Sequence, residues 1–203
     1  MISILKWAPW ALAGLVMATP SIAQTSPLAL TPFLGAGLTF GGETLATAYY
    51  NNGDSQDVTT GGLVDLRAGI EYRLSNSPVA LQMAVAYHVG NTTAKNGSLK
   101  FSRFPVELVG MYDFGNQWRV GFGIRQATGA KVSASGDAVY QAGYGASTSF
   151  KADTGALIQL EYRVSPQVGI QARYVKESYT VQDYTHQAID GSHGGVFGVF
   201  YFN

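Results

Sequence analysis

Strict alternation of apolar and polar residues recurs along most of the chain and limits its fold more than any other feature. In residues 64–73 the even positions are apolar from Val64 to Tyr72, and four of the five odd positions are charged. Successive side chains of a β-strand point to opposite faces of its sheet, so a period of two predicts a strand. The same pattern predicts seven more strands, at residues 34–40, 79–88, 103–112, 118–125, 156–163, 168–174 and 196–202.

The connectors between these strands alternate between short and long. The short ones, at 74–78, 114–117 and 164–167, contain the Asn, Gly, Ser and Pro residues that form tight turns. The long ones span about 41–60, 89–99, 127–150 and 177–193, and two of them contain Asn-Gly, a strong hairpin signal. We therefore expect antiparallel strand pairs that close tightly at one end and project as long hairpins at the other.

Residues 1–23 have the layout of a secretory signal peptide. Lys6 supplies the positive charge, residues 11–18 form the apolar segment, and Pro20 precedes the expected cleavage site after Ala23. The apolar run is too short for a membrane anchor, because a spanning helix needs about 20 residues. The mature chain would then be a single domain, residues 24–203. The sequence contains no cysteine, which excludes a disulfide framework and a lipid-bearing N-terminal cysteine.

Alternation alone does not say which face of the sheet lies inside. A barrel in water buries its apolar face, whereas a transmembrane barrel exposes that face to lipid. Here the apolar faces end in aromatic residues at both ends of the strands, as in the two aromatic girdles of a membrane-spanning barrel. We expect the girdles to contain Tyr72, Tyr87, Tyr112, Trp118, Tyr162 and Tyr174.

The opposite, charged faces are rich in small residues. They include Gly35, Gly37, Gly69, Ala80, Ala84, Gly121, Gly123 and Gly169. Glycine weakens a strand, but it leaves room for long side chains inside a narrow barrel. The apolar stripes are ten residues or shorter, and about 9–11 tilted strand residues cross a bilayer. The sequence thus predicts an all-β fold: an eight-stranded antiparallel up-and-down transmembrane β-barrel, closed so that every backbone group is paired.

Composition disfavours several classes of protein. Charged residues make up 13% of the chain, about half of the roughly 25% that is usual for soluble proteins. The formal net charge at pH 7 is zero, so a polybasic nucleic-acid surface is not expected. With no long apolar run in the mature chain, this composition disfavours both a cytosolic enzyme and a helical membrane protein.

The whole pattern, including the aromatic end GVFGVFYFN at 195–203, resembles the small outer-membrane barrels of Gram-negative bacteria, such as the OmpA transmembrane domain and OmpX. The resemblance implies export through the periplasm to the outer membrane, with short turns and termini in the periplasm and long loops outside the cell. It implies that Phe200 and Phe202 belong to the signal read by the barrel-assembly machinery. It also implies contact with outer-membrane lipid and lipopolysaccharide.

The charged residues on the inward face predict a polar interior. Eight strands leave a space that side chains just fill, and arginine pairs well with carboxylates in two-point contacts. We expect a filled lumen of such pairs, with a narrow anion-attracting passage as the alternative. The expected lumen residues are Asp65, Arg67, Glu71, Arg73, Arg103, Glu107, Arg119, Arg125, Glu161, Arg163 and Arg173, to which Asp113, Asp153 and Glu177 could add negative charge.

The three histidines bear on whether the protein is an enzyme. Some outer-membrane barrels that modify lipid A use a histidine with a serine and a carboxylate, and a nucleophile needs a base within reach. His88 faces inward, whereas His186 and His193 lie near Asp183, Asp190 and Ser192. No deacylase motif accompanies them, and the seven-residue spacing of the last two histidines matches no standard metal site. We expect a hydrogen-bonded His88, and no catalytic residue, metal or cofactor.

The long connectors are polar and contain Tyr49, Tyr50, Tyr140, Tyr144, Tyr179 and Tyr184. Surface tyrosines form good contacts at little entropic cost, so these loops are candidates for binding an extracellular partner. We expect a monomeric barrel with a structural or surface-interaction role and no catalysis. Two alternatives stay open: a narrow pore or carrier for small or apolar solutes, and a lipid A-modifying enzyme.

Overall fold

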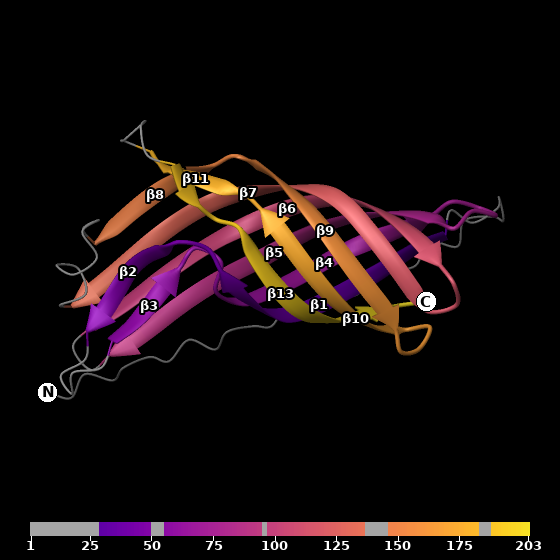
Figure 1. Cartoon of the computed structure of the whole chain (residues 1–203), viewed down its shortest axis with the longest axis horizontal. Coiled ribbons are helices and arrows are strands. Elements are labelled where there is room, and N and C mark those ends of the chain that lie inside the picture. The colour runs from indigo at the N-terminus through magenta and orange to yellow at the C-terminus, as the bar shows by residue number, and fades with distance from the viewer. Residues whose placement is uncertain (1–28, 50–54, 95–96, 137–145, 183–187) are drawn as a thin grey trace, which may run out of the picture.

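The computed structural model describes residues 29–49, 55–94, 97–136, 146–182 and 188–203. Eight strands form a closed antiparallel barrel (Figure 1), because β9 pairs with both β7 and β10 and β13 pairs with both β10 and β1. This confirms the predicted fold, while the predicted signal peptide lies outside the described residues. In order around the barrel the strands are β1 (Ala29–Gly41), β4 (Leu63–Arg73), β5 (Val79–Ala94), β6 (Gly97–Phe114), β7 (Trp118–Gly136), β9 (Thr154–Arg163), β10 (Val168–Lys176) and β13 (His193–Tyr201).

Short turns join the strands at one end of the barrel, between β4 and β5, β6 and β7, and β9 and β10, where the sequence predicts them. The C-terminus lies at this end (Figure 1). Asn76 and Gly115 have φ values of 55° and 72° in the first two turns. These left-handed conformations are ones that glycine and asparagine adopt most easily.

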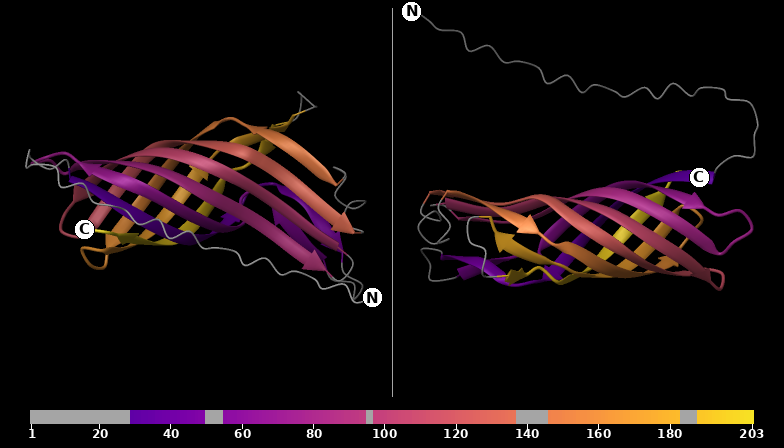
Figure 2. Two further views of the ribbon diagram at one scale, coloured as in Figure 1. Left: turned by 180° about the vertical axis from the view of Figure 1, so that it is seen from behind. Right: turned by 90° about the horizontal axis from the view of Figure 1, so that it is seen from above.

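At the other end the sheet continues past the barrel strands that the sequence predicts. β5, β6 and β7 have 16, 18 and 19 residues, and β8 (Ser147–Ala152), β11 (Ser178–Val181) and β12 (Ala188–Asp190) join the same sheet. β2 (Thr44–Tyr49) and β3 (Ser55–Thr59) form a separate hairpin. We use the name extension for β2, β3, β8, β11 and β12 together with residues 89–94 of β5, 97–102 of β6 and 130–136 of β7. Figure 2 shows from behind and from above that it prolongs the tilted strands of the tube.

The predicted long connectors are thus largely β-structure, and the boundaries predicted for β5, β6 and β7 were too short. Outward positions in the extension hold Ser and Lys, as at residues 98, 100, 131, 133, 149 and 151. The outward-facing apolar residues therefore stop where the strands leave the lipid, and the apolar residues of the extension face inward instead. The Asn-Gly hairpin tips fall wholly or partly outside the described residues.

A β-bulge also hides the alternation in β7. The pairing with β6 shifts by one residue between Ser102 and Phe104. Gly129, which lies in the extra length of β7, has a φ of +60°, a value that glycine adopts without strain. Inward-facing residues occupy odd positions before the bulge and even positions after it. A pattern with a constant period of two therefore cannot be followed through this strand.

The apolar faces of the strands lie outside the barrel. Leu34, Leu66 and Leu108 expose 51, 49 and 39% of their surface, whereas Asp65 and Arg103 expose none. A protein folded in water has the opposite arrangement, because burial of apolar surface drives its folding. An apolar band outside and charges inside are typical of a transmembrane barrel. The described residues contain no helix long and apolar enough to cross a membrane.

Aromatic residues border this apolar band at both ends. Tyr112, Trp118 and Tyr174 are exposed, and Tyr72, Tyr87 and Tyr162 are half-buried. Tyr72, Tyr112, Trp118 and Tyr162 lie next to the short turns, and Tyr87 and Tyr174 lie toward the extension. Phe200 and Phe202 are exposed at the short-turn end, with ring centres 5.0 Å apart.

We predict that Leu108→Arg destabilises the barrel, because Leu108 lies outward on β6 halfway between Phe104 and Tyr112. An arginine near the bilayer midplane costs about 2–4 kcal/mol. Ser149→Arg is the control, because Ser149 is exposed on β8 in the extension. Urea unfolding of both variants in lipid vesicles measures the difference. Equal stability of the two variants would show that Leu108 does not face lipid.

Candidate functional site

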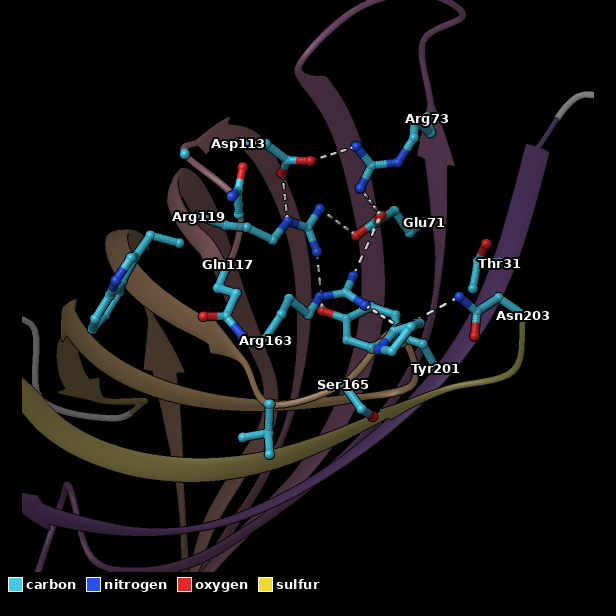
Figure 3. Close-up of a pocket in the computed structure, with 15 residues that line it drawn as sticks. Thr31, Glu71, Arg73, Asp113, Gln117, Arg119, Arg163, Ser165, Tyr201 and Asn203 are labelled. Atoms are coloured by element: carbon cyan, nitrogen blue, oxygen red, sulfur yellow. Dashed lines mark hydrogen bonds and ion pairs between the residues drawn. The ribbon is translucent and has the colours of Figure 1, made fainter.

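The charged residues inside the barrel form two layers, of which the inner layer lies at the short-turn end. Arg119 is at its centre, with its guanidinium 2.7 Å from Glu71, 2.7 Å from Asp113 and 3.4 Å from Glu161. Most of the layer lines a pocket of about 440 Å³, drawn in Figure 3. The inner layer consists of Glu71, Arg73, Asp113, Arg119, Glu161 and Arg163. It therefore holds three arginines and three carboxylates, and it is neutral overall.

Tyr201 completes the inner layer, although it is not among the lumen residues predicted from the sequence. Its side chain is fully buried, and its hydroxyl donates a hydrogen bond to Glu161 over 2.7 Å. The guanidinium carbon of Arg163 lies 3.6 Å from the centre of its ring. Because β13 is apolar on both faces, alternation gave it no clear phase. The available signal was the hydroxyl of Tyr201, the one polar side-chain group among residues 196–202, in the row with Phe197 and Val199.

Uncharged polar side chains connect this layer to its surroundings. Gln82 donates a hydrogen bond to Glu71 over 2.8 Å, and Gln171 donates one to Glu161 over 2.6 Å. Gln159 donates one to Gln82 over 3.2 Å. A search for charges misses these glutamines, but each occupies an inward position of a predicted strand. Inward position, rather than charge, is the signal that would have found them.

The outer layer lies between the inner layer and the extension. Glu107 is at its centre and lies 2.8 Å from Arg173, 2.9 Å from Arg125 and 3.4 Å from Arg67. Asp65 lies 3.0 Å from Arg67 and 3.4 Å from Arg125. The outer layer consists of Asp65, Arg67, Arg103, Glu107, Arg125, Arg173 and Glu177. Four arginines against three carboxylates leave it with one net positive charge.

Glu177 and Arg103 close the outer layer on the side of the extension. Glu177 lies 3.2 Å from Arg125 and 3.7 Å from Arg103, and accepts a hydrogen bond from Tyr179 over 2.7 Å. Arg103 is fully buried, with its guanidinium carbon 4.9 Å from the centre of the Phe101 ring. Such contacts between a cation and an aromatic face strengthen when water is excluded. At this level the interior changes from ionic to aromatic.

Small inward residues leave space for these side chains. A Cβ atom on Gly35 would lie 2.8 Å from Cγ of Arg67. A Cβ atom on Gly121 would lie 2.5 Å from Sδ of Met111 and 2.7 Å from Cγ of Gln159. Real Cβ atoms do not approach other atoms this closely. Glycine at these positions therefore leaves the space that the long side chains beside it occupy in the lumen.

His88 is fully buried and held by hydrogen bonds. Thr39 Oγ1 lies 2.8 Å from its Nε2, Arg103 lies 3.4 Å from the same atom, and Arg125 Nη2 lies 3.0 Å from Nδ1. Arginine only donates, and Arg125 is the nearer of the two arginines, so Nδ1 accepts from Arg125 and the ring proton is on Nε2, which donates to Thr39; Arg103 is then a neighbour of Nε2 and not a hydrogen-bond partner. In this tautomer His88 cannot take a proton from Thr39. Asp65 is 3.7 Å from Nδ1, too far for a hydrogen bond.

Beyond the outer layer the interior of the extension is apolar. The ring centre of Phe101 lies 5.8 Å from that of Phe150 and 5.5 Å from that of Tyr179. This outer core consists of Leu45, Val58, Leu99, Phe101, Ala127, Ala130, Val132, Phe150, Ala152, Tyr179 and Ile189. Side chains from the β2–β3 hairpin and from the main sheet meet in it. The extension therefore has an apolar core of its own.

Two predictions made from the long connectors were wrong. Tyr179, expected on the surface, is fully buried in the outer core, because β11 continues the inward alternation of β10. Burial raises the pKa of Tyr179, so its hydroxyl stays protonated as a donor to Glu177. Asp153, a candidate for the lumen, is exposed and accepts a hydrogen bond from Ser178 over 2.7 Å. Tyr50, Tyr140, Tyr144, Tyr184, Asp183, His186 and the side chain of Tyr49 lie outside what the structure describes.

His193 lies inside the barrel, with its ring centre 4.9 Å from that of His88. Its Nδ1 forms a hydrogen bond with the carbonyl of Gly191 over 2.7 Å. Asp190 is exposed, and Ser192 is half-buried beside it. Within the part of the chain that the structure describes, no group of three or more histidine, aspartate or glutamate residues is arranged to hold a metal ion.

We predict that Glu107→Gln destabilises the barrel by roughly 3–5 kcal/mol, because the buried arginines around it lose their shared carboxylate. Adding Arg173→Gln to Glu107→Gln removes one uncompensated charge and should restore part of the loss. Urea unfolding in vesicles measures these two variants and the single variant Arg173→Gln. Additive effects of the two substitutions would contradict the coupling of Glu107 to Arg173.

Comparisons with known proteins agree with this architecture. No protein-family model and no curated protein matches the chain. Among solved structures, it is similar to Ail of Yersinia pestis, determined in complex with the heparin analogue sucrose octasulfate. The two are 12% identical, with a TM-score of 0.51 over 85% of this chain and 96% of Ail. Neisserial surface protein A is 13% identical, with a TM-score of 0.48 over 85% of this chain and 95% of that one.

The likeness to Ail shows the fold, and the outward apolar band with its aromatic borders shows which solvent surrounds it. Every strand of the barrel has a neighbour on both sides, as a hydrocarbon environment requires. The chain therefore has the fold of the small eight-stranded outer-membrane β-barrels, with an apolar band that faces the lipid of a membrane.

Proposed function

We propose that the protein is a closed, non-catalytic barrel with a structural or surface-interaction role. The observation that carries this proposal is the filled interior. The inner layer, the outer layer and the outer core follow one another along the barrel, around Arg119, Glu107 and Phe101. A solute moving through would have to separate buried ion pairs in both layers and then displace packed apolar side chains. Leaving buried charges unpaired costs several kcal/mol for each pair.

The extension supports the surface-interaction part of the proposal. Phe101, Val132 and Tyr179 expose 1% of their surface or less in its core, so its strands form a packed unit beyond the apolar band. Binding residues carried on rigid elements lose little conformational freedom when a partner binds. We propose that a monomeric barrel presents the hairpins of the extension to an extracellular partner, and that Phe200 and Phe202 are read by the assembly machinery during biogenesis.

The two alternative functions fit the interior less well. A pore or carrier needs a continuous passage, whereas Glu107 is enclosed by Arg67, Arg125 and Arg173 above the pocket of the inner layer. A lipid A-modifying enzyme needs a reactive group that meets lipid. His88 and Thr39 are buried inside the barrel, exposing 0 and 4% of their surface.

We predict that the folded protein does not form a stable ion channel in planar lipid bilayers. Current steps should not exceed the background of the protein-free bilayer, because ion pairs and apolar packing fill the interior. Gel mobility of the same preparation with and without boiling verifies that the inserted protein is folded. A stable channel of large conductance would replace the closed barrel with the pore function.

We also predict that expression of the protein leaves the acyl chains of lipid A unchanged. Mass spectra of lipid A from cells with and without the protein should be the same, because the described interior offers lipid no reactive group. His88→Ala serves as the matched variant. An acyl chain that is lost or gained with wild type, but not with His88→Ala, would identify a lipid A-modifying enzyme.

A further inference from the structure

The two types of basic residue occupy different environments. Arg67, Arg103, Arg119, Arg125 and Arg173 expose 6% of their surface or less inside the barrel, and Arg73 and Arg163 pair with carboxylates of the inner layer. The lysines of the described strands, Lys100, Lys131, Lys151 and Lys176, are all exposed. Each points outward from the extension or from the strand end that leads into it. The lysines therefore lie on the outer surface just beyond the apolar band.

Three of these lysines form a row across neighbouring strands. Lys131 on β7 pairs with Ser102 on β6, so it is diagonal to Lys100. Lys131 also pairs with Ser149 on β8, so it is diagonal to Lys151. Diagonal neighbours in antiparallel strands are about 7–8 Å apart. We call Lys100, Lys131 and Lys151 the lysine row.

The lysine row runs parallel to the membrane. The girdle residues Tyr112 on β6 and Trp118 on β7 have the same relation as Lys100 and Lys131. Tyr112 pairs with Val120, and Trp118 lies two residues before Val120, just as Lys131 lies two residues before Ser133, the partner of Lys100. Strand tilt makes such a diagonal nearly level around a barrel. The row therefore follows the direction of the aromatic girdle rather than climbing away from it.

The row also lies within reach of the lipid headgroups. Lys100 is four residues beyond Phe104, the last exposed apolar residue of β6 on that side. Its ammonium nitrogen lies 5.6 Å from the ring centre of Tyr87, so the side chain bends back toward the girdle. Lysines at membrane borders place their charge in the headgroup region in this way.

The charges of the row are not neutralised by the described residues. None of the three lysines forms an ion pair there, and the residues paired with them are uncharged: Asn91, Ser102, Ser133, Ser149 and Thr180. Asp153, a nearby carboxylate, accepts a hydrogen bond from Ser178. Lys176 stands apart on β10. Its charge makes a small contribution to lowering the pKa of Asp190 on β12, which is lowered mainly by hydrogen bonds from Ser192.

We propose that the lysine row binds the phosphate groups of the phosphorylated glycolipid in the outer leaflet. Three ammonium groups flanked by hydroxyls supply point charges and donors for phosphate oxygens. Their level beside the girdle matches headgroups of the surrounding bilayer, which favours lipid over a soluble anion. The proposal rests on the extracellular orientation of the extension, and it does not depend on whether the interior conducts.

The test measures binding of fluorescent lipid A to the folded full-length barrel in detergent, by anisotropy. Wild type is compared with K100Q/K131Q/K151Q and with K100R/K131R/K151R, which keeps the charges. Each lysine contributes about fivefold to affinity near an anionic surface, so the glutamine variant should bind on the order of 100-fold more weakly. The arginine variant should bind like wild type. Dephosphorylated lipid A should bind wild type as weakly as lipid A binds the glutamine variant.

Gel mobility with and without boiling shows that all three proteins are folded, as expected for substitutions of exposed residues. Unchanged affinity of the glutamine variant, or equal binding of dephosphorylated lipid A, would overturn the proposal. Sucrose octasulfate is the probe that tests whether the lysine row binds soluble anions. If it binds wild type as tightly as lipid A does, and loses affinity equally in the glutamine variant, the row is a site for soluble polyanions and the lipid assignment is wrong.

Discussion

Closure of the sheet is the constraint on which the rest of the structure depends. Strands in hydrocarbon must pair on both sides, and here β13 meets β1 while β9 meets β7. An eight-stranded ring has a narrow interior that its own side chains must fill. Long charged residues beside glycines, such as Arg67 next to Gly35, fill it. Because these charges are removed from water, each must find a partner, and the paired layers follow from the ring.

The division between arginine and lysine follows from the same geometry. Arginine keeps its charge when buried and offers several donors in a fixed plane, so Arg125 can contact Glu107, Asp65 and Glu177 together. Lysine carries a strongly hydrated point charge on a flexible stem. It is better suited to Lys100 and Lys131, which are exposed on the outer surface. One chain thus uses its two kinds of cation for cohesion inside and contact outside.

Period-two alternation was sufficient to predict the strands, because they depend on side-chain parity alone. The facing of their surfaces also needed the aromatic borders and the small residues of the charged face, and closure followed from placing the apolar face in lipid. Partners within the interior could not be predicted, since the contact of Arg119 with Glu71 depends on the stagger of distant strands. Tyr201 was missed where both faces are apolar, and Tyr179 and the extension were missed where lipid no longer selects apolar residues. The bulge at Gly129 removed the parity signal from the middle of β7.

The apolar core of the extension has a consequence for how the surface of this protein can change. Packing around Phe101 and Phe150 is stabilised by exclusion of water, whereas the layers below are stabilised by ion pairing. The outermost hairpins therefore rest on a foundation that is stabilised by a different kind of packing from the bilayer-spanning tube. Substitutions and insertions at the tips can accumulate without loosening that tube, so the exposed face is free to diversify while the anchor stays constant.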